Sequence, residues 1–139
     1  MIHELVRSTI KSPMEMTNAI NWFEIPVSDY DRAKKFYCSI YEYEMVEMDM
    51  QGTKMGMLPH DPASGGIGGA ICYGEGYTPS TQGAKVYLNG GKDLNVVLGR
   101  VESAGGQVIM EKTKITDEIG YFAIFADTEG NQVSLHSPG

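Results

Sequence analysis

The sequence predicts an α+β fold made of two βαβββ modules, related by internal duplication, whose curled mixed sheets enclose a cleft. The order strand, helix, strand, strand, strand can be followed twice along the chain of 139 residues. Equivalent positions keep a nearly constant spacing, since Trp22 aligns with Lys85 and Ala70 with Ser134, at offsets of 63 and 64 residues. A repeat of this length indicates a duplicated module and not a solenoid unit. Seventeen glycines fit a fold with many strands and tight turns.

The first module begins with a strand over residues 19–27, along which two kinds of side chain alternate. The face of this strand that is expected to pack under a helix consists of Phe23, Ile25 and Val27. The helix spans residues 31–40 and is capped by Ser28 or Asp29, because these side chains accept a backbone N–H at a helix start. Three further strands are expected over residues 41–48, 53–60 and 67–74.

The second module repeats this order, starting with a strand over residues 84–90. A helix over residues 92–104 follows, with a glycine pair as its C-terminal stop. Its inward positions fall at helical spacing and are Leu94, Val97, Leu98 and Val101. Val86 and Leu88 of the strand are expected to lie beneath them. Three strands complete the module, over residues 107–115, 120–127 and 131–137.

The domain organisation follows from this repeat. Residues 1–17 are interpreted as an N-terminal arm, and residues 18–139 as a single domain with modules 18–83 and 84–139. Each module has one helix on a small sheet, which is too little core for independent folding. Paired modules can keep their helices outside and enclose a ligand cleft.

The charge balance argues against two classes of partner. Eighteen acidic residues against eleven basic ones give a net charge of −7, so the cations that nucleic acid or an anionic membrane requires are scarce. No segment has the composition of a signal peptide or the length of a membrane span. Cys38 and Cys72 lack metal-like spacing, and as reduced thiols they indicate a cytoplasmic protein. Eight short strands leave exposed edges, which favours a homodimer.

Three segments carry a resemblance to a known family, namely EIPVSDYDRAKKFY, GGKDLNVVLGRVESAGG and FAIFADTEGNQVSLH. Through them, residues 18–138 resemble the vicinal oxygen chelate superfamily, also called the glyoxalase, bleomycin resistance protein and dioxygenase family. The resemblance implies the paired-module fold. It leaves the activity open, because the family includes glyoxalase I, ring-cleaving dioxygenases, epimerases, drug-inactivating transferases and proteins that only sequester a drug.

The resemblance also implies where a metal would be held. In the family a divalent metal binds two neighbouring substrate oxygens, and its His or carboxylate ligands come from the first and last strands of each module. The matching positions here are Trp22, Ala70, Lys85 and Ser134. An indole, a methyl group and a protonated ammonium do not ligate a cation, and a serine hydroxyl alone is a weak ligand. We therefore predict neither a metal nor another cofactor.

With the neighbouring positions added, the expected ligand cleft consists of Trp22, Glu24, Ala70, Cys72, Lys85, Tyr87, Ser134 and His136. Glu24 is the candidate catalytic residue, as a general base on an otherwise apolar strand, and the alternative is a structural ion pair with Lys85. Cys72 and His136 either form a thiol–imidazole nucleophile or fill space in the core. His60 lies in a loop, where it is either solvated or functional.

Two classes of function are compatible with these residues, and the sequence does not decide whether the protein is an enzyme. The first is a protein with a small-molecule cleft that binds its ligand, or acts on it, without a metal. Trp22, which is suited to stacking on a flat ligand, and the acidic balance favour this class. The alternative is a metal-dependent lyase similar to lactoylglutathione lyase, or a dioxygenase, acting on a small substrate with vicinal oxygens.

Overall fold

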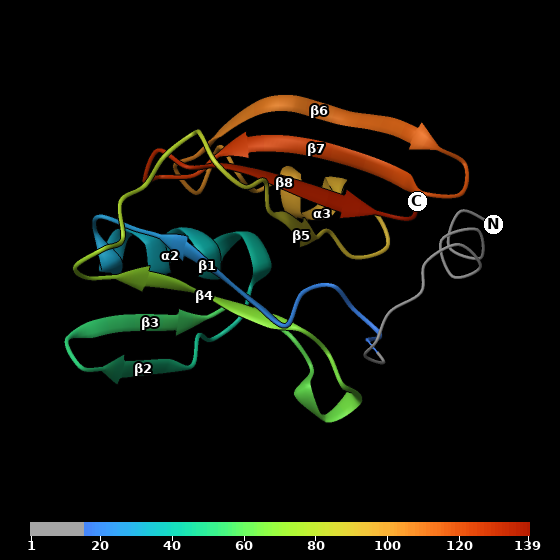
Figure 1. Ribbon diagram of the computed structural model, residues 1–139. Coiled ribbons are helices and arrows are strands. Elements are labelled where there is room, and N and C mark those ends of the chain that lie inside the picture. The colour runs from blue at the N-terminus through green and yellow to red at the C-terminus, as the bar shows by residue number, and fades with distance from the viewer. Residues whose placement is uncertain (1–15) are drawn as a thin grey trace.

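The computed structural model describes residues 16–139, so most of the expected arm over residues 1–17 lies outside the described residues. Figure 1 shows the arrangement of the elements. The first module contains β1 (Trp22–Pro26), α2 (Tyr30–Tyr41), β2 (Glu47–Met50), β3 (Thr53–Met57), a 3-10 turn η1 (Pro62–Ser64) and β4 (Gly68–Tyr73). The second contains β5 (Tyr87–Asn89), α3 (Asn95–Leu98), β6 (Gln107–Thr116), β7 (Gly120–Ala126) and β8 (Gln132–Ser137).

Each module forms its own four-stranded mixed sheet, which confirms the predicted fold class and the duplication. The strand orders are β1-β4-β3-β2 and β5-β8-β7-β6, and neither sheet is closed. In the first sheet β1 runs parallel to β4 with Glu24 opposite Ala70. In the second, β5 runs parallel to β8 with Tyr87 opposite Ser134. The same register therefore recurs at the positions that the sequence offset makes equivalent.

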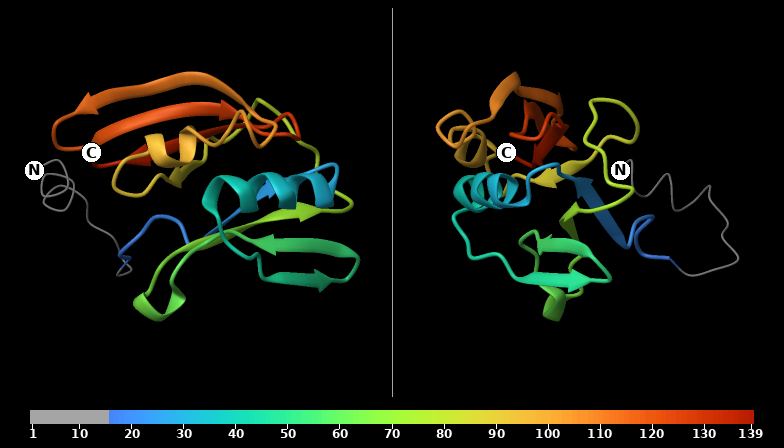
Figure 2. Two further views of the ribbon diagram at one scale, coloured as in Figure 1. Left: turned by 180° about the vertical axis from the view of Figure 1, so that it is seen from behind. Right: turned by 90° about the vertical axis from the view of Figure 1, so that its left-hand side faces the viewer.

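Both helices lie on the same side of the two sheets (Figure 2). They share one apolar core with both sheets, in which Ile25 and Val27 of β1 are buried and Phe23 packs partly buried against them. Leu88 of β5 is buried in the same core, with Val86 beside it. The predicted inward face of the first strand in each module is thereby confirmed, since these side chains meet the helices and the alternate ones do not.

The helix of the second module is shorter than predicted. Its inward residues are buried as expected, namely Leu94, Val97, Leu98 and Val101. Regular α-helix covers only Asn95–Leu98, and turns continue to Gly105 with i to i+3 bonds such as Arg100 N to Val97 O at 3.0 Å. Gly99 follows the helix directly, and glycine is a poor helix former, so the tighter i to i+3 turns take over there.

The second strand also begins later than predicted. The alternating segment over residues 41–48 becomes strand only at Glu47. Helix α2 continues to Tyr41, and Glu42 caps it in a left-handed conformation with its N–H bonded to Cys38 O. A strand needs extended backbone from its first residue, so no strand can start at the left-handed Glu42. The apolar spacing over residues 41–46 reflects packing of Tyr43, whose hydroxyl donates to Met57 O at 2.7 Å.

Among the described residues no helix has both the length and the apolar character needed to cross a membrane.

Candidate functional site

A cavity of about 540 Å³ opens on the face of the first sheet that is turned away from helix α2. Its lining consists of Trp22, Glu24, Met48, Met50, Gln51, Thr53, Met55, Met57 and Tyr77. The strands β1, β2 and β3 supply most of these residues, and Tyr77 comes from the loop after β4. We call it the methionine cavity. Its floor is a small apolar cluster formed by Met55, Ala70 and Cys72, against which Met57 and Tyr77 pack.

Glu24 is held in this cavity by two aromatic donors. Tyr77 Oη donates to Glu24 Oε1 at 2.7 Å, and Trp22 Nε1 donates to Glu24 Oε2 at 3.2 Å. The glutamate side chain is exposed, so it faces solvent and cavity at once. Its predicted alternative partner Lys85 donates instead to Thr81 O at 3.1 Å. Glu24 and Lys85 therefore do not form the ion pair considered from the sequence.

Cys72 and Tyr77 stay protonated beside Glu24 at neutral pH. Burial raises the pKa of the Cys72 thiol to about 12. The hydrogen bond to the Glu24 carboxylate raises the pKa of Tyr77 to about 12 as well. A thiol with this pKa supplies almost no thiolate at neutral pH, and the thiolate is the nucleophilic form. The arrangement is thus suited to holding the carboxylate and not to thiol chemistry.

A second hollow, of about 500 Å³, lies between the neighbouring edge strands β1 and β5. Glu24 borders it from one side, and Lys85 and Tyr87 border it from the other. Tyr87 is 56% exposed, the most open aromatic side chain of the described residues. Four of the predicted cleft residues, Trp22, Glu24, Lys85 and Tyr87, therefore line two adjoining hollows and not one enclosed cleft.

Ser134 and His136 of β8 line neither hollow. Ser134 is buried, and His136 Nε2 lies 2.6 Å from Ile119 O, which makes Nε2 the protonated ring nitrogen because a carbonyl only accepts. Cys72 Sγ is directed to Ala70 O, so the thiol–imidazole pair does not form. The exposed His60 has Nδ1 3.2 Å from Leu58 O.

The side chains at the positions where the family holds its metal do not fit a divalent cation. Trp22 Nε1 and Lys85 Nζ are donors already engaged by Glu24 and Thr81, and neither has a free electron pair for a metal. Ala70 has no ligand atom, and Ser134 offers a single hydroxyl. Across residues 16–139 no three His, Cys, Asp or Glu side chains come together in a group that could hold a metal ion.

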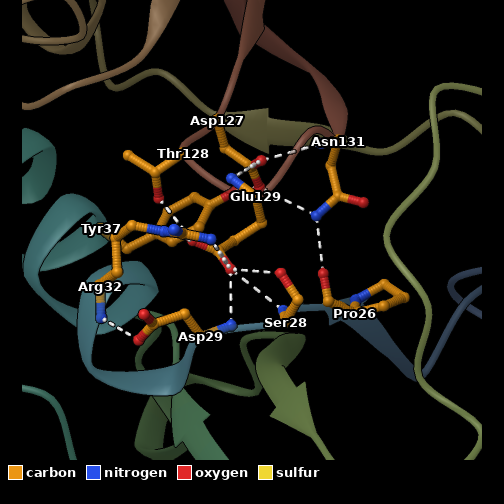
Figure 3. Close-up of polar contacts among 9 residues, drawn as sticks. All are labelled: Pro26, Ser28, Asp29, Arg32, Tyr37, Asp127, Thr128, Glu129 and Asn131. Carbon is orange, nitrogen blue, oxygen red and sulfur yellow. Dashed lines mark hydrogen bonds and ion pairs between the residues drawn. The ribbon is translucent and has the colours of Figure 1, made fainter.

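A buried polar network, which the sequence did not reveal, joins the two modules at the C-terminal end of β1 (Figure 3). Its centre is Glu129, in the turn between β7 and β8, whose side chain is fully buried. Glu129 accepts hydrogen bonds from Ser28 N at 3.0 Å, Asp29 N at 2.8 Å and Thr128 Oγ1 at 2.9 Å. Arg32 Nε of helix α2 adds a charged bond of 2.7 Å. The second module thereby caps the start of the first module's helix.

Asp127 forms the second half of this network. It accepts from Tyr37 Oη at 2.7 Å, from Glu129 N at 2.8 Å and from Asn131 N at 2.9 Å. Asn131 Nδ2 also donates to Pro26 O at 2.7 Å and so reaches β1. We call the two halves together the module latch. The sequence signal was present, since DTEGN places two carboxylates in one turn, but nothing local identified their partners.

Burial alone would raise the pKa of Glu129, but the hydrogen bonds from Arg32, Asp29, Thr128 and Ser28 outweigh it and lower that pKa to about 2. The carboxylate is therefore ionised at neutral pH although it is buried. The module latch therefore stabilises the contact between the two modules, while the methionine cavity contains the groups that can contact a ligand.

Comparison with known proteins agrees with this geometry. The family model of the glyoxalase/bleomycin resistance protein/dioxygenase superfamily matches residues 19–135. A glyoxylase-like domain-containing protein from Didymella fabae is 28% identical over 124 residues, covering 85% of this chain and 92% of that protein.

Solved structures with the same fold include a glyoxalase I variant from Zea mays, with a TM-score of 0.64 and 21% identity. That match covers 84% of this chain but only 45% of the maize chain, so the present chain spans about half its length. TnmS3, an antibiotic binding protein from Streptomyces sp. CB03234, gives a TM-score of 0.60 at 18% identity and covers 90% of this chain and 100% of its own. With its family model matched over both modules, the chain belongs to the glyoxalase/bleomycin resistance protein/dioxygenase superfamily.

Proposed function

We propose that this protein binds a small organic molecule in the methionine cavity without using a metal. The observation that carries the proposal is the composition of the lining, in which four methionines and Trp22 surround one hydrogen-bonded carboxylate. A pocket of several hundred cubic ångströms with apolar walls and few polar groups is typical of small-molecule sites. Binding, or conversion by Glu24 alone, is the chemistry that such a lining supports.

The walls suit a ligand with a flat apolar part. Methionine side chains are flexible and polarizable, so they adapt to ligands of different shape and favour contact with aromatic rings. Met48 and Met50 are about half exposed, at 47% and 52%, and a bound molecule would cover them. The structural likeness to TnmS3, which is described as an antibiotic binding protein, supports a binding role by analogy of fold.

The double substitution Met48→Ser and Met50→Ser tests the site. Nile red, a neutral aromatic dye whose emission rises in apolar surroundings, is expected to bind the wild type one to one and the variant about tenfold more weakly. The loss follows from the apolar area that the two thioethers would share with the dye. The matched control is Ile109→Ser with Met110→Ser on strand β6, where exposure is similar at 49% and 41%. Equal loss in both variants would contradict the proposal.

The absence of a metal requirement is a separate prediction. Because Trp22, Ala70, Lys85 and Ser134 offer one neutral oxygen between them, a divalent ion would lose its water without gaining ligands. We expect untagged protein to carry less than about a tenth of an equivalent of zinc, nickel, manganese or iron, measured by elemental mass spectrometry. Stoichiometric metal, removed by a chelator together with lyase or dioxygenase activity, would establish the metal-dependent alternative instead.

The homodimer and the cytoplasmic location expected from the sequence stay predictions.

A further inference from the structure

We infer that the ligand of the methionine cavity is a lipophilic ammonium ion, an amine protonated at neutral pH and attached to an aromatic ring system, with Glu24 as its counter-ion. The inference rests on the proposed function and names the class of molecule that the site takes. Three features of the cavity lead to it, namely its charge, the direction of its hydrogen-bond donors and the aromatic faces beside the carboxylate.

Among the described residues, Glu24 is the only charged one in the cavity lining. No lysine, arginine or histidine of the described residues forms an ion pair with it, because the described ion pairs all join other carboxylates. The nearest candidate from the sequence, Lys85, is engaged by Thr81 O. Within residues 16–139 the cavity therefore carries one negative charge without an ion-pair partner, and a cation entering it would supply that partner.

The two aromatic donors of the cavity are already used. Trp22 Nε1–H and Tyr77 Oη–H both point at the Glu24 carboxylate, one to each oxygen. Each carboxylate oxygen has a second lone pair, so Glu24 can still accept from a ligand. Besides these three residues, Gln51 and Thr53 are the only described residues that bring polar side chains to the lining. A ligand that donates hydrogen bonds to Glu24 fits this arrangement, whereas an anionic ligand would be repelled by the Glu24 carboxylate and would find only the neutral donors of Gln51 and Thr53.

The aromatic rings beside Glu24 favour the same kind of ligand. Trp22 is 40% exposed and its indole borders the cavity together with the Tyr77 ring. An ammonium group near a carboxylate and over an indole face gains both ion-pair and cation–π attraction. The four thioethers can then cover the apolar remainder of the molecule. The net charge of −7 adds attraction of cations at long range, which salt screens.

Three probes of nearly equal size separate charge from apolar contact: 2-naphthylmethylammonium, 2-naphthylmethanol and 2-naphthoate. Isothermal titration calorimetry at pH 7.5 is expected to give an affinity for the ammonium about tenfold higher than for the alcohol, and a lower affinity for the carboxylate. Carbon-13 methyl signals of the cavity methionines are expected to shift on binding, which locates the probes independently.

The substitution Glu24→Gln removes the charge, keeps an amide oxygen that can accept from Trp22 Nε1, and presents an amide N–H that the Tyr77 hydroxyl can accept. It should lower the affinity for the ammonium probe about fivefold to tenfold and change the affinity for the alcohol by less than about twofold, as expected for a partly exposed ion pair. Asp49→Asn is the matched control, because it removes the same charge from strand β2, next to Met48 and Met50 but on the opposite face. This variant should bind all three probes as the wild type does.

Two results would overturn the inference in distinguishable ways. If none of the probes binds or moves a cavity methionine, the proposed function fails and the inference with it. If the alcohol and the ammonium bind equally well and Glu24→Gln changes neither, the cavity is a binding site but its ligand is not chosen by charge.

Discussion

Replacing Glu129 by alanine is expected to lower the free energy of unfolding by about 3 kcal/mol, because it removes the buried acceptor of the module latch. Ser28 N and Asp29 N would lose the carboxylate they bond at 3.0 and 2.8 Å, and each unsatisfied N–H carries a cost of its own. Arg32 is half exposed and can turn to water, which keeps the loss at the lower end for a buried ion pair. Urea unfolding followed by circular dichroism measures the change.

The same residue gives the wild type a specific dependence on pH. The folded pKa of Glu129 is lowered to about 2 from a usual 4.5, so its contribution is fully present above about pH 5. It is lost as the pH falls through 4.5 towards 2, since the carboxylate must then be protonated against its hydrogen bonds. Glu129→Gln keeps the acceptor without the charge and should flatten this part of the stability profile. An unchanged profile would show that other carboxylates control acid unfolding.

Replacing Phe36 by alanine is expected to cost about 3–5 kcal/mol of unfolding free energy. Phe36 is fully buried on helix α2, and its ring lies 5.8 Å from the ring of Phe125 in the other module and 4.9 Å from that of Tyr37. The substitution would leave a cavity at the contact between the modules, and the closely packed sheets around it could not move in to fill it. Thermal and urea unfolding are the measurements.

Phe122→Ala is the matched control for this prediction. Phe122 is only half-buried and sits on β7 with its side chain opposite the buried Ala123 and Phe125, so the same atoms are removed outside the shared core. The control should lose less than half as much stability. Equal losses would mean that Phe36 does not hold the modules together more than an ordinary aromatic residue does. Neither change touches the methionine cavity, so Nile red binding should persist in whatever fraction stays folded.

The alternation of apolar and polar side chains along the strands predicted much of the fold. Alternation along β1 placed Ile25 and Val27 in the core and Trp22 and Glu24 on the other face, as the structure has them. Such alternation is reliable because a strand turned over by one residue would expose its whole apolar face to water. The ends of elements depend on more than this alternation. The helix of the second module stops at Leu98, before Gly99, where the apolar spacing alone predicted more turns of helix.

The sequence by itself determined the duplicated modules, the face of each strand and the residue types at the family's metal positions. The tertiary structure alone decided which side chains meet. Glu24 bonds Tyr77, 53 residues away, instead of Lys85, and Glu129 bonds Arg32 across 97 residues. Alternation fixes the face on which a side chain lies, but a hydrogen bond also depends on loop paths, strand register and rotamers set by the packed whole. Partners in the cavity and in the latch are consequences of that packing.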